Sequence, residues 1–166
     1  MYRQMAKSII KSAKPKHVPA SAADKVSRDK KSIGHEALVN RMASMRRVFG
    51  SYTEVSEGVS SRYVRDLEPL GITRDDIRQI VPDRTLDRRI AAGDLLRIDE
   101  ADGIARLLRV VTMARETFED AGLADSWLRS PNPALGDNIP IRMARTDLGG
   151  REVEAALGRL ASGVFS

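Results

Sequence analysis

The stretch from Glu100 to Asp120, "EADGIARLLRVVTMARETFED", decides the fold class of this chain. Its apolar residues recur every three or four positions and cover about a third of a helical circumference, as in an amphipathic helix packed on a core. Carboxylates favour helix N-termini, so this helix is expected to begin at Asp99. The predicted core face contains Ile104, Leu107, Leu108, Val111, Ala114 and Phe118. The predicted solvent face contains Arg106, Arg109, Glu116 and Asp120.

Helical spacing continues on both sides of this stretch. Residues 36–49 carry apolar side chains at helical intervals, and residues 50–63 suit a loop or a short helix. No segment alternates β-branched and polar residues, and aromatic residues make up only 4% of the chain, which disfavours β-sandwiches and barrels. We therefore predict an all-α protein.

Composition limits where such a protein works. A chain of 166 residues with 42% hydrophobic content can bury a core as one domain or two small ones. The absence of cysteine excludes disulfides and thiolate metal sites and favours an intracellular location. No apolar run approaches the ~20 residues that span a bilayer, and the N-terminus lacks the apolar region of a signal peptide. These features predict a cytoplasmic protein that does not enter membranes.

The positive charge is concentrated at the N-terminus. Residues 1–47 have a balance of +9 and residues 48–166 a balance of −4, which together give the net +5. Every lysine lies at or before Lys31, and all later basic residues are arginine. Residues 1–50 are therefore predicted to be a basic leader, partly disordered or helical. It either contacts phosphates or another polyanion, or simply keeps the protein soluble.

Residues 73–92 have the dimensions of a helix-turn-helix. Thr73 is expected to cap the first helix, which stops near Val81-Pro82, and Asp83 to cap the second, which ends at Ala92-Gly93. On the second helix Leu86 and Ile90 point one way, and the opposite face is predicted to contain Arg84, Thr85, Arg88 and Arg89. This face either reads DNA or carries arginines that pair with Asp83, Asp87 and Asp94.

The segment "WLRSPNPALGDNIPIRM", residues 127–143, interrupts the long helices with three prolines. Asn132 is a predicted N-cap, Gly136 ends the short helix that follows, and Pro140 can open another. Trp127 is either the anchor of a binding surface or a core residue. The segment holds more apolar side chains than it can bury alone. They are therefore expected to pack on the long helix, on a second copy or on a partner, and they are Leu128, Leu135, Ile139, Ile141 and Met143.

Residues 124–165, "ADSWLRSPNPALGDNIPIRMARTDLGGREVEAALGRLASGVF", resemble the C-terminal toxin-binding domain of the MbcA/ParS/Xre antitoxins. The shared pattern is A-x-x-W-L, P-N-x-A-L-G, a turn opened by proline, T-x-x-G and a V-x-x-x-L helix ending in G-V. Residues 84–111 are also similar to the helix-turn-helix half of Xre proteins whose partners are RES-domain toxins. Asp137 departs from the pattern, because relatives often have a second glycine there.

The resemblance implies the antitoxin of a type II toxin–antitoxin pair. It implies a helix-turn-helix DNA-binding and dimerisation domain at 51–122, a toxin-binding domain at 123–166 and a homodimer that represses its own operon. The partner would be a RES-domain toxin that degrades NAD⁺, neutralised when the antitoxin occludes its active site. DNA would be contacted by Arg84, Thr85, Arg88 and Arg89. The toxin would be contacted by Trp127, Leu128, Asn132, Leu135, Arg159, Leu160, Gly163, Val164, Phe165 and Ser166.

The sequence leaves two alternatives to this function. An enzyme is disfavoured, because the two histidines, His17 and His35, both lie in the leader and no phosphate-binding loop is present. Asp99, Glu100 and Asp102 are better explained as carboxylates at a helix start. No cofactor, metal or small-molecule substrate is therefore expected. The other alternative is a stand-alone helix-turn-helix regulator whose C-terminal domain mediates dimerisation. Arg115, on the apolar face of the long helix, is expected either to extend to its edge or to contact a partner.

Overall fold

The computed structural model describes residues 34–163, so most of the basic leader and the last three residues lie outside it. The chain divides into two units, Met1–His35 and Glu36–Ser166, and the described helices lie in the second apart from the first two residues of α2. No strand occurs in the described part, which contains only two isolated β-bridges, and the all-α prediction is confirmed. The predicted boundaries at residues 50 and 122 remain predictions.

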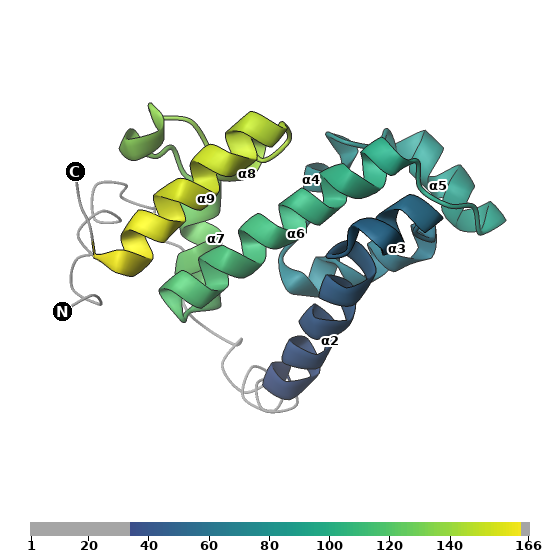
Figure 1. The fold of residues 1–166 in the computed structure, drawn as a ribbon, viewed down its shortest axis with the longest axis horizontal. Helices are drawn as coiled ribbons and strands as arrows, with labels where there is room; N and C mark the ends of the chain where they lie inside the picture. Colours follow the sequence, from purple (N-terminus) through teal and green to yellow (C-terminus); the bar gives the residue numbers. More distant parts are fainter. Residues whose placement is uncertain (1–33, 164–166) are drawn as a thin grey trace, which may run out of the picture. The chain divides into compact units, whose positions relative to one another are not determined.

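The helices follow one another closely along the chain (Figure 1). The first half consists of α2 (Gly34–Phe49), α3 (Tyr52–Glu57), the 3₁₀ helices η1 (Ser61–Asp66) and η2 (Glu68–Leu70), α4 (Arg74–Arg78) and α5 (Asp83–Ala92). The second half consists of α6 (Ile98–Phe118), α7 (Ala121–Arg129), η3 (Pro133–Leu135), α8 (Pro140–Met143) and α9 (Asp147–Ser162).

Helix α6 is the central element of the core. It contacts α3, α7, α8 and α9, and Figure 1 shows α7 and α9 beside its second half. The predicted core face is buried, apart from Phe118, which is half-buried. Ala101, Val110 and Thr112 are buried as well, so α6 buries more than one face. A helix with neighbours on several sides needs more buried residues than a single apolar stripe provides.

This additional burial overturns one prediction. Arg106 was expected to face solvent, but only 8% of it is exposed. Its Nε donates a hydrogen bond to the carbonyl of Ala144 at 3.3 Å, and its NH1 pairs with Asp102 at 2.9 Å. The charge is tolerated inside because both ends of the guanidinium have acceptors. Arg109 does lie on the exposed side and pairs with Glu154.

Of the two helix caps predicted in the first half, the structure confirms one. The Thr73 backbone N–H donates to the Asp76 carboxylate at 2.8 Å and the Thr73 hydroxyl accepts from the Asp76 N–H, which confirms the predicted start of α4. Helix α4 ends earlier than expected, at Arg78. The predicted Asp83 cap is wrong, because Pro82 occupies the N-cap position and Asp83 is the first residue of α5.

The proline-rich segment after α7 folds as its sequence predicts. The Asn132 side chain accepts from the Ala134 N–H at 3.0 Å and starts η3. Gly136 and Asp137 both have positive φ angles, 63° and 60°, so Asp137 is a non-glycine residue in the left-handed region that favours glycine. Pro140 opens α8, and Thr146 caps α9 by accepting from the Gly149 N–H.

The apolar side chains of this segment pack within the chain. Leu128, Leu135 and Ile141 are buried in the common core. Ile139 and Met143 are partly exposed and pack against it. Of the three locations that the sequence left open, these residues use the chain's own helices α6, α7 and α9.

Candidate functional site

Helix α5 presents two arginines to solvent. Leu86 and Ile90 are buried, with 1% and 6% exposure, and fix the side of the helix that faces the core. Arg84 and Arg88 lie on the opposite side at i, i+4 and are exposed. Within residues 34–163, neither of them has a carboxylate at ion-pair distance. These two guanidiniums are therefore available to an anionic partner.

Arg89 does not belong to this exposed face, contrary to the prediction. Its side chain is only 12% exposed and pairs with Glu100, which is 9% exposed and also accepts a hydrogen bond from the Arg97 N–H at 2.9 Å. Thr85, on the same flank of α5, is half-buried. Residue 89 lies about 100° from residue 88 around the helix, and this rotation turns it toward the start of α6.

The acidic residues of α5 are engaged by another helix. Arg74 of α4 donates to Asp83 at 2.9 Å and also pairs with Asp87. The hydrogen bond to Asp87, followed by that to Asp83, raises the pKa of Arg74 above its ordinary value. These carboxylates therefore orient α4 against α5. The sequence left open that they pair with arginines of the exposed face, but neither Asp83 nor Asp87 pairs with Arg84 or Arg88.

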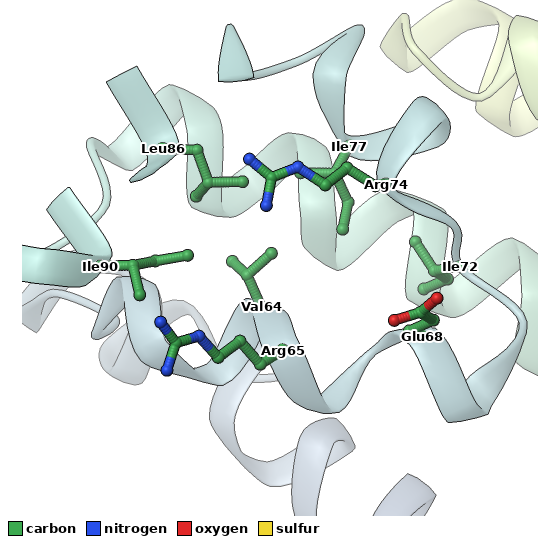
Figure 2. A pocket seen from close by; sticks show the side chains of 8 residues that line it. All are labelled: Val64, Arg65, Glu68, Ile72, Arg74, Ile77, Leu86 and Ile90. Carbon is green, nitrogen blue, oxygen red and sulfur yellow. The ribbon is translucent and has the colours of Figure 1, made fainter. Parts of the chain in front are cut away.

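A small cavity lies between η1, η2, α4 and α5. Figure 2 shows the Arg65 and Arg74 side chains reaching across it toward Ile90 and Leu86, with Glu68 near Ile72 at the other end. Its volume is about 120 Å³, well below the ~300 Å³ at which small-molecule sites begin. It has room for one aliphatic side chain and not for a nucleotide or cofactor. The lining residues are Val64, Arg65, Glu68, Ile72, Arg74, Ile77, Leu86 and Ile90.

The residues predicted to meet the toxin fall into two groups, and the first is structural. Trp127 is half-buried and packs on Phe118, with ring centroids 5.8 Å apart and planes inclined by 45°. Leu128 and Leu135 are buried, with 2% and 8% exposure. The structure thus places both leucines in the core and not on a surface that a partner could meet. Asn132 caps η3.

The second group lies at the end of α9. Arg159 is exposed, and Leu160 is half-buried against the core. Gly163 closes the helix in the left-handed conformation, with φ 67°, and is exposed. Val164, Phe165 and Ser166 lie outside the described residues. Among the described residues of this group, those in the last turn of α9 are therefore accessible to a partner.

An ionic junction that the sequence did not reveal joins the two halves of the protein. Arg129, at the end of α7, donates to both carboxylate oxygens of Asp76 at 3.0 and 2.8 Å and to the carbonyl of Gly71 at 2.9 Å. Asp76 is only 4% exposed and also accepts from Thr73. Burial alone would raise the pKa of Asp76, but the hydrogen bonds from Arg129 and Thr73 outweigh it and hold that pKa below its ordinary value.

Arg115 lies close to this junction and contacts the chain itself. Its side chain is 15% exposed and sits 3.8 Å from the carboxylate of Asp125. A Cβ at Gly71, where φ is 88°, would lie 2.5 Å from the Arg115 guanidinium. Arg115 was expected either to extend to the edge of α6 or to contact a partner. In the structure its guanidinium lies between α7 and Gly71 of the same chain.

Comparison with known proteins identifies the family. The antitoxin Xre/MbcA/ParS C-terminal toxin-binding domain matches residues 113–163, from the second half of α6 to the end of α9. An antitoxin Xre of Pseudomonas putida is 32% identical over 116 residues, which cover 69% of this chain and 73% of the relative. This chain belongs to the Xre antitoxin family.

Two further relatives match shorter regions. An antitoxin Xre of Yersinia enterocolitica is 37% identical over 87 residues, or 52% of this chain and 59% of the relative. A protein of a Sphingobium species named Prs ADP-ribosylating antitoxin is 30% identical over 91 residues, or 49% of this chain and 57% of the relative.

Residues 34–163 of the present chain contain no cluster of metal-ligating side chains, and none of the helices described is long and apolar enough to cross a bilayer.

Proposed function

We propose that this chain is the antitoxin of a type II toxin–antitoxin pair and neutralises its toxin through the domain at residues 113–163. The observation that carries the proposal is the family match, which spans α7, η3, α8, α9 and the half of α6 on which they pack. The helices of this region pack on a common core, in which Leu128, Val153 and Leu157 are at most 2% exposed. A rigid surface binds a protein partner at a lower entropic cost than a flexible one.

The toxin is proposed to be a RES-domain enzyme that degrades NAD⁺. The proposal draws on the resemblance of residues 84–111 to Xre proteins paired with such toxins. One relative's name refers to ADP-ribosylation, a reaction whose ADP-ribose donor is NAD⁺. Neutralisation would be by occlusion, in which the end of α9 and residues 164–166 enter the mouth of the active site. Arg159, exposed in the last turn of α9, would meet the rim of that site.

The proposal is tested by searching the neighbouring reading frames for a RES-type toxin and co-expressing that toxin with the chain. The full chain is expected to restore growth and to form a complex with the toxin. A chain ending at Gly163 is expected to fold normally, because Leu160 and every core residue of α9 are retained, yet to lose rescue. Failure of the full chain to bind or rescue would refute the antitoxin function. Full rescue by the shortened chain would refute only the occlusion by its last three residues.

Autoregulation through DNA is proposed for α4 and α5. Two short helices joined by Gln79–Pro82 fit a helix-turn-helix, and the exposed Arg84 and Arg88 suit phosphate contact or bidentate reading of guanine. Arg89 would support this surface indirectly, by fixing α5 against Glu100. Paired operator half-sites would require a homodimer. Operator binding without toxin binding would instead favour the stand-alone regulator.

A further inference from the structure

The corner between α8 and α9 exposes an apolar side chain flanked by unpaired cations. Leu148, in the first turn of α9, is 70% exposed and is the one large hydrophobic residue exposed to this degree among residues 113–163. Arg142 and Arg145 precede it and are both exposed. No carboxylate of the described helices lies at ion-pair distance from either arginine, although many other arginines of the protein are paired.

This corner is held in one shape from inside. The buried Arg106 donates to the Ala144 carbonyl, and a Cβ at Gly150 would lie 2.8 Å from the Arg106 side chain. A side chain at Gly149 would collide with the Met143 carbonyl. Both glycines are fully packed and therefore serve close approach between α6, α8 and α9. The backbone that carries Leu148 is thus fixed before any partner arrives.

A fixed, exposed leucine is unfavourable in water unless a partner covers it. A single exposed hydrophobic residue is common on protein surfaces, but here it coincides with two unpaired guanidiniums in seven residues of sequence. Interfaces are enriched in arginine and in apolar anchors that fill pockets, surrounded by polar contacts. Arg142 lies in α8 and Arg145 in the turn that follows it, where the Arg145 N–H donates to the Arg142 carbonyl at 3.3 Å, so one turn of backbone carries both arginines.

We infer that Arg142, Arg145 and Leu148 form a toxin-docking surface, the arginine–leucine corner, separate from the end of α9. Its complement on the toxin is an apolar pocket edged by carboxylates. This inference rests on the proposed function, and it assigns a second contact that anchors the toxin while the end of α9 reaches its active site. The corner lies at the N-terminal end of α9 and the predicted occluding residues at the C-terminal end, so the contacts are separated by a helix of 16 residues.

The test compares charge-reversing variants of the full chain in binding to the purified toxin. Leu148→Glu, and separately the double variant Arg142→Glu/Arg145→Glu, are each expected to raise the dissociation constant at least about tenfold, as for interface anchors. Matched controls are Tyr52→Glu, which changes an 88% exposed side chain of α3, and Arg47→Glu on α2. These controls are expected to change the constant less than about twofold, because they lie outside the toxin-binding domain.

Each outcome separates the corner from the proposed function. Glutamate is favoured in the first turn of a helix, so Leu148→Glu is expected to fold with an unchanged melting temperature. If the unmodified chain does not bind the toxin, the proposed function fails. If the unmodified chain binds and both corner variants bind equally well, the corner inference fails alone. A change in self-association with unaltered toxin binding would assign the corner to a second copy of the chain and would also overturn the inference.

Discussion

The junction between Arg129 and Asp76 allows one prediction to be worked out in detail. Replacing Arg129 with methionine keeps most of the side-chain length but leaves the Asp76 carboxylate 4% exposed without its cation. Removal of one partner from a buried pair costs about 3–5 kcal/mol. The Arg129 side chain is 37% exposed, so solvent reduces this cost, and we expect a loss of about 2–3 kcal/mol in the free energy of unfolding at pH 7.

The loss should depend on pH with a defined sign. In the native protein the pKa of Asp76 lies below its ordinary value, so its stabilisation is present at pH above the unfolded pKa, about 3.9, and is lost as the pH falls through the native value. Without Arg129, only the hydrogen bonds from Thr73 oppose the effect of burial, so the pKa of Asp76 should be higher than in the unmodified protein and the variant should take up a proton at higher pH. The stability gap between the two proteins should therefore narrow as the pH falls from 7 to 3.

The assay is urea denaturation followed by far-ultraviolet circular dichroism at several pH values. Arg159→Met is the control, because Arg159 also lies in the last turn of a helix but is exposed and makes no ion pair with the described residues. It should change stability by less than about 0.5 kcal/mol. An Arg129→Met variant no less stable than this control, or a gap that stays constant between pH 7 and pH 3, would refute the reasoning.

Three further predictions concern single sites. Replacing Arg84 and Arg88 with alanine should weaken operator binding and lower its salt-dependence slope by about one to two units, measured by fluorescence anisotropy across salt concentrations; an unaltered slope would show that α5 does not contact phosphates. Leu157→Asp buries an unpaired charge at a fully buried position and should lower the free energy of unfolding by several kcal/mol, enough to unfold the C-terminal helices. A variant with unchanged thermal melting would contradict the assignment of Leu157 to the core. Asp137→Gly should raise the melting temperature through a gain of up to about 1 kcal/mol, because glycine adopts the observed φ of 60° without strain; a lower melting temperature would count against this reason.

Local signals in the sequence predicted local structure well. The caps at Thr73 and Asn132 were predictable because each involves residues at most three positions apart. Spacing on α5 correctly placed Leu86 and Ile90 on the buried side. Such features depend on the geometry of one helix turn, which the sequence specifies directly.

Features that depend on distant segments were missed. The burial of Arg106 depends on Ala144, 38 residues away, and the burial of Asp76 depends on Arg129, 53 residues away. Arg89 was assigned to the exposed face because a helical wheel cannot show that α6 covers its flank. The arginine–leucine corner did leave a trace in the sequence, since Leu148 lies outside the apolar phase of α9 that contains Val153 and Leu157.

The central position of α6 has a genetic consequence. Its buried residues support the helices on both sides, so a cavity there should abolish growth rescue and operator repression together. Mutations that separate the two phenotypes should instead map to outward-facing positions. A random-mutagenesis screen scored for both phenotypes would then sort scaffold residues from contact residues without any structure of the assembly.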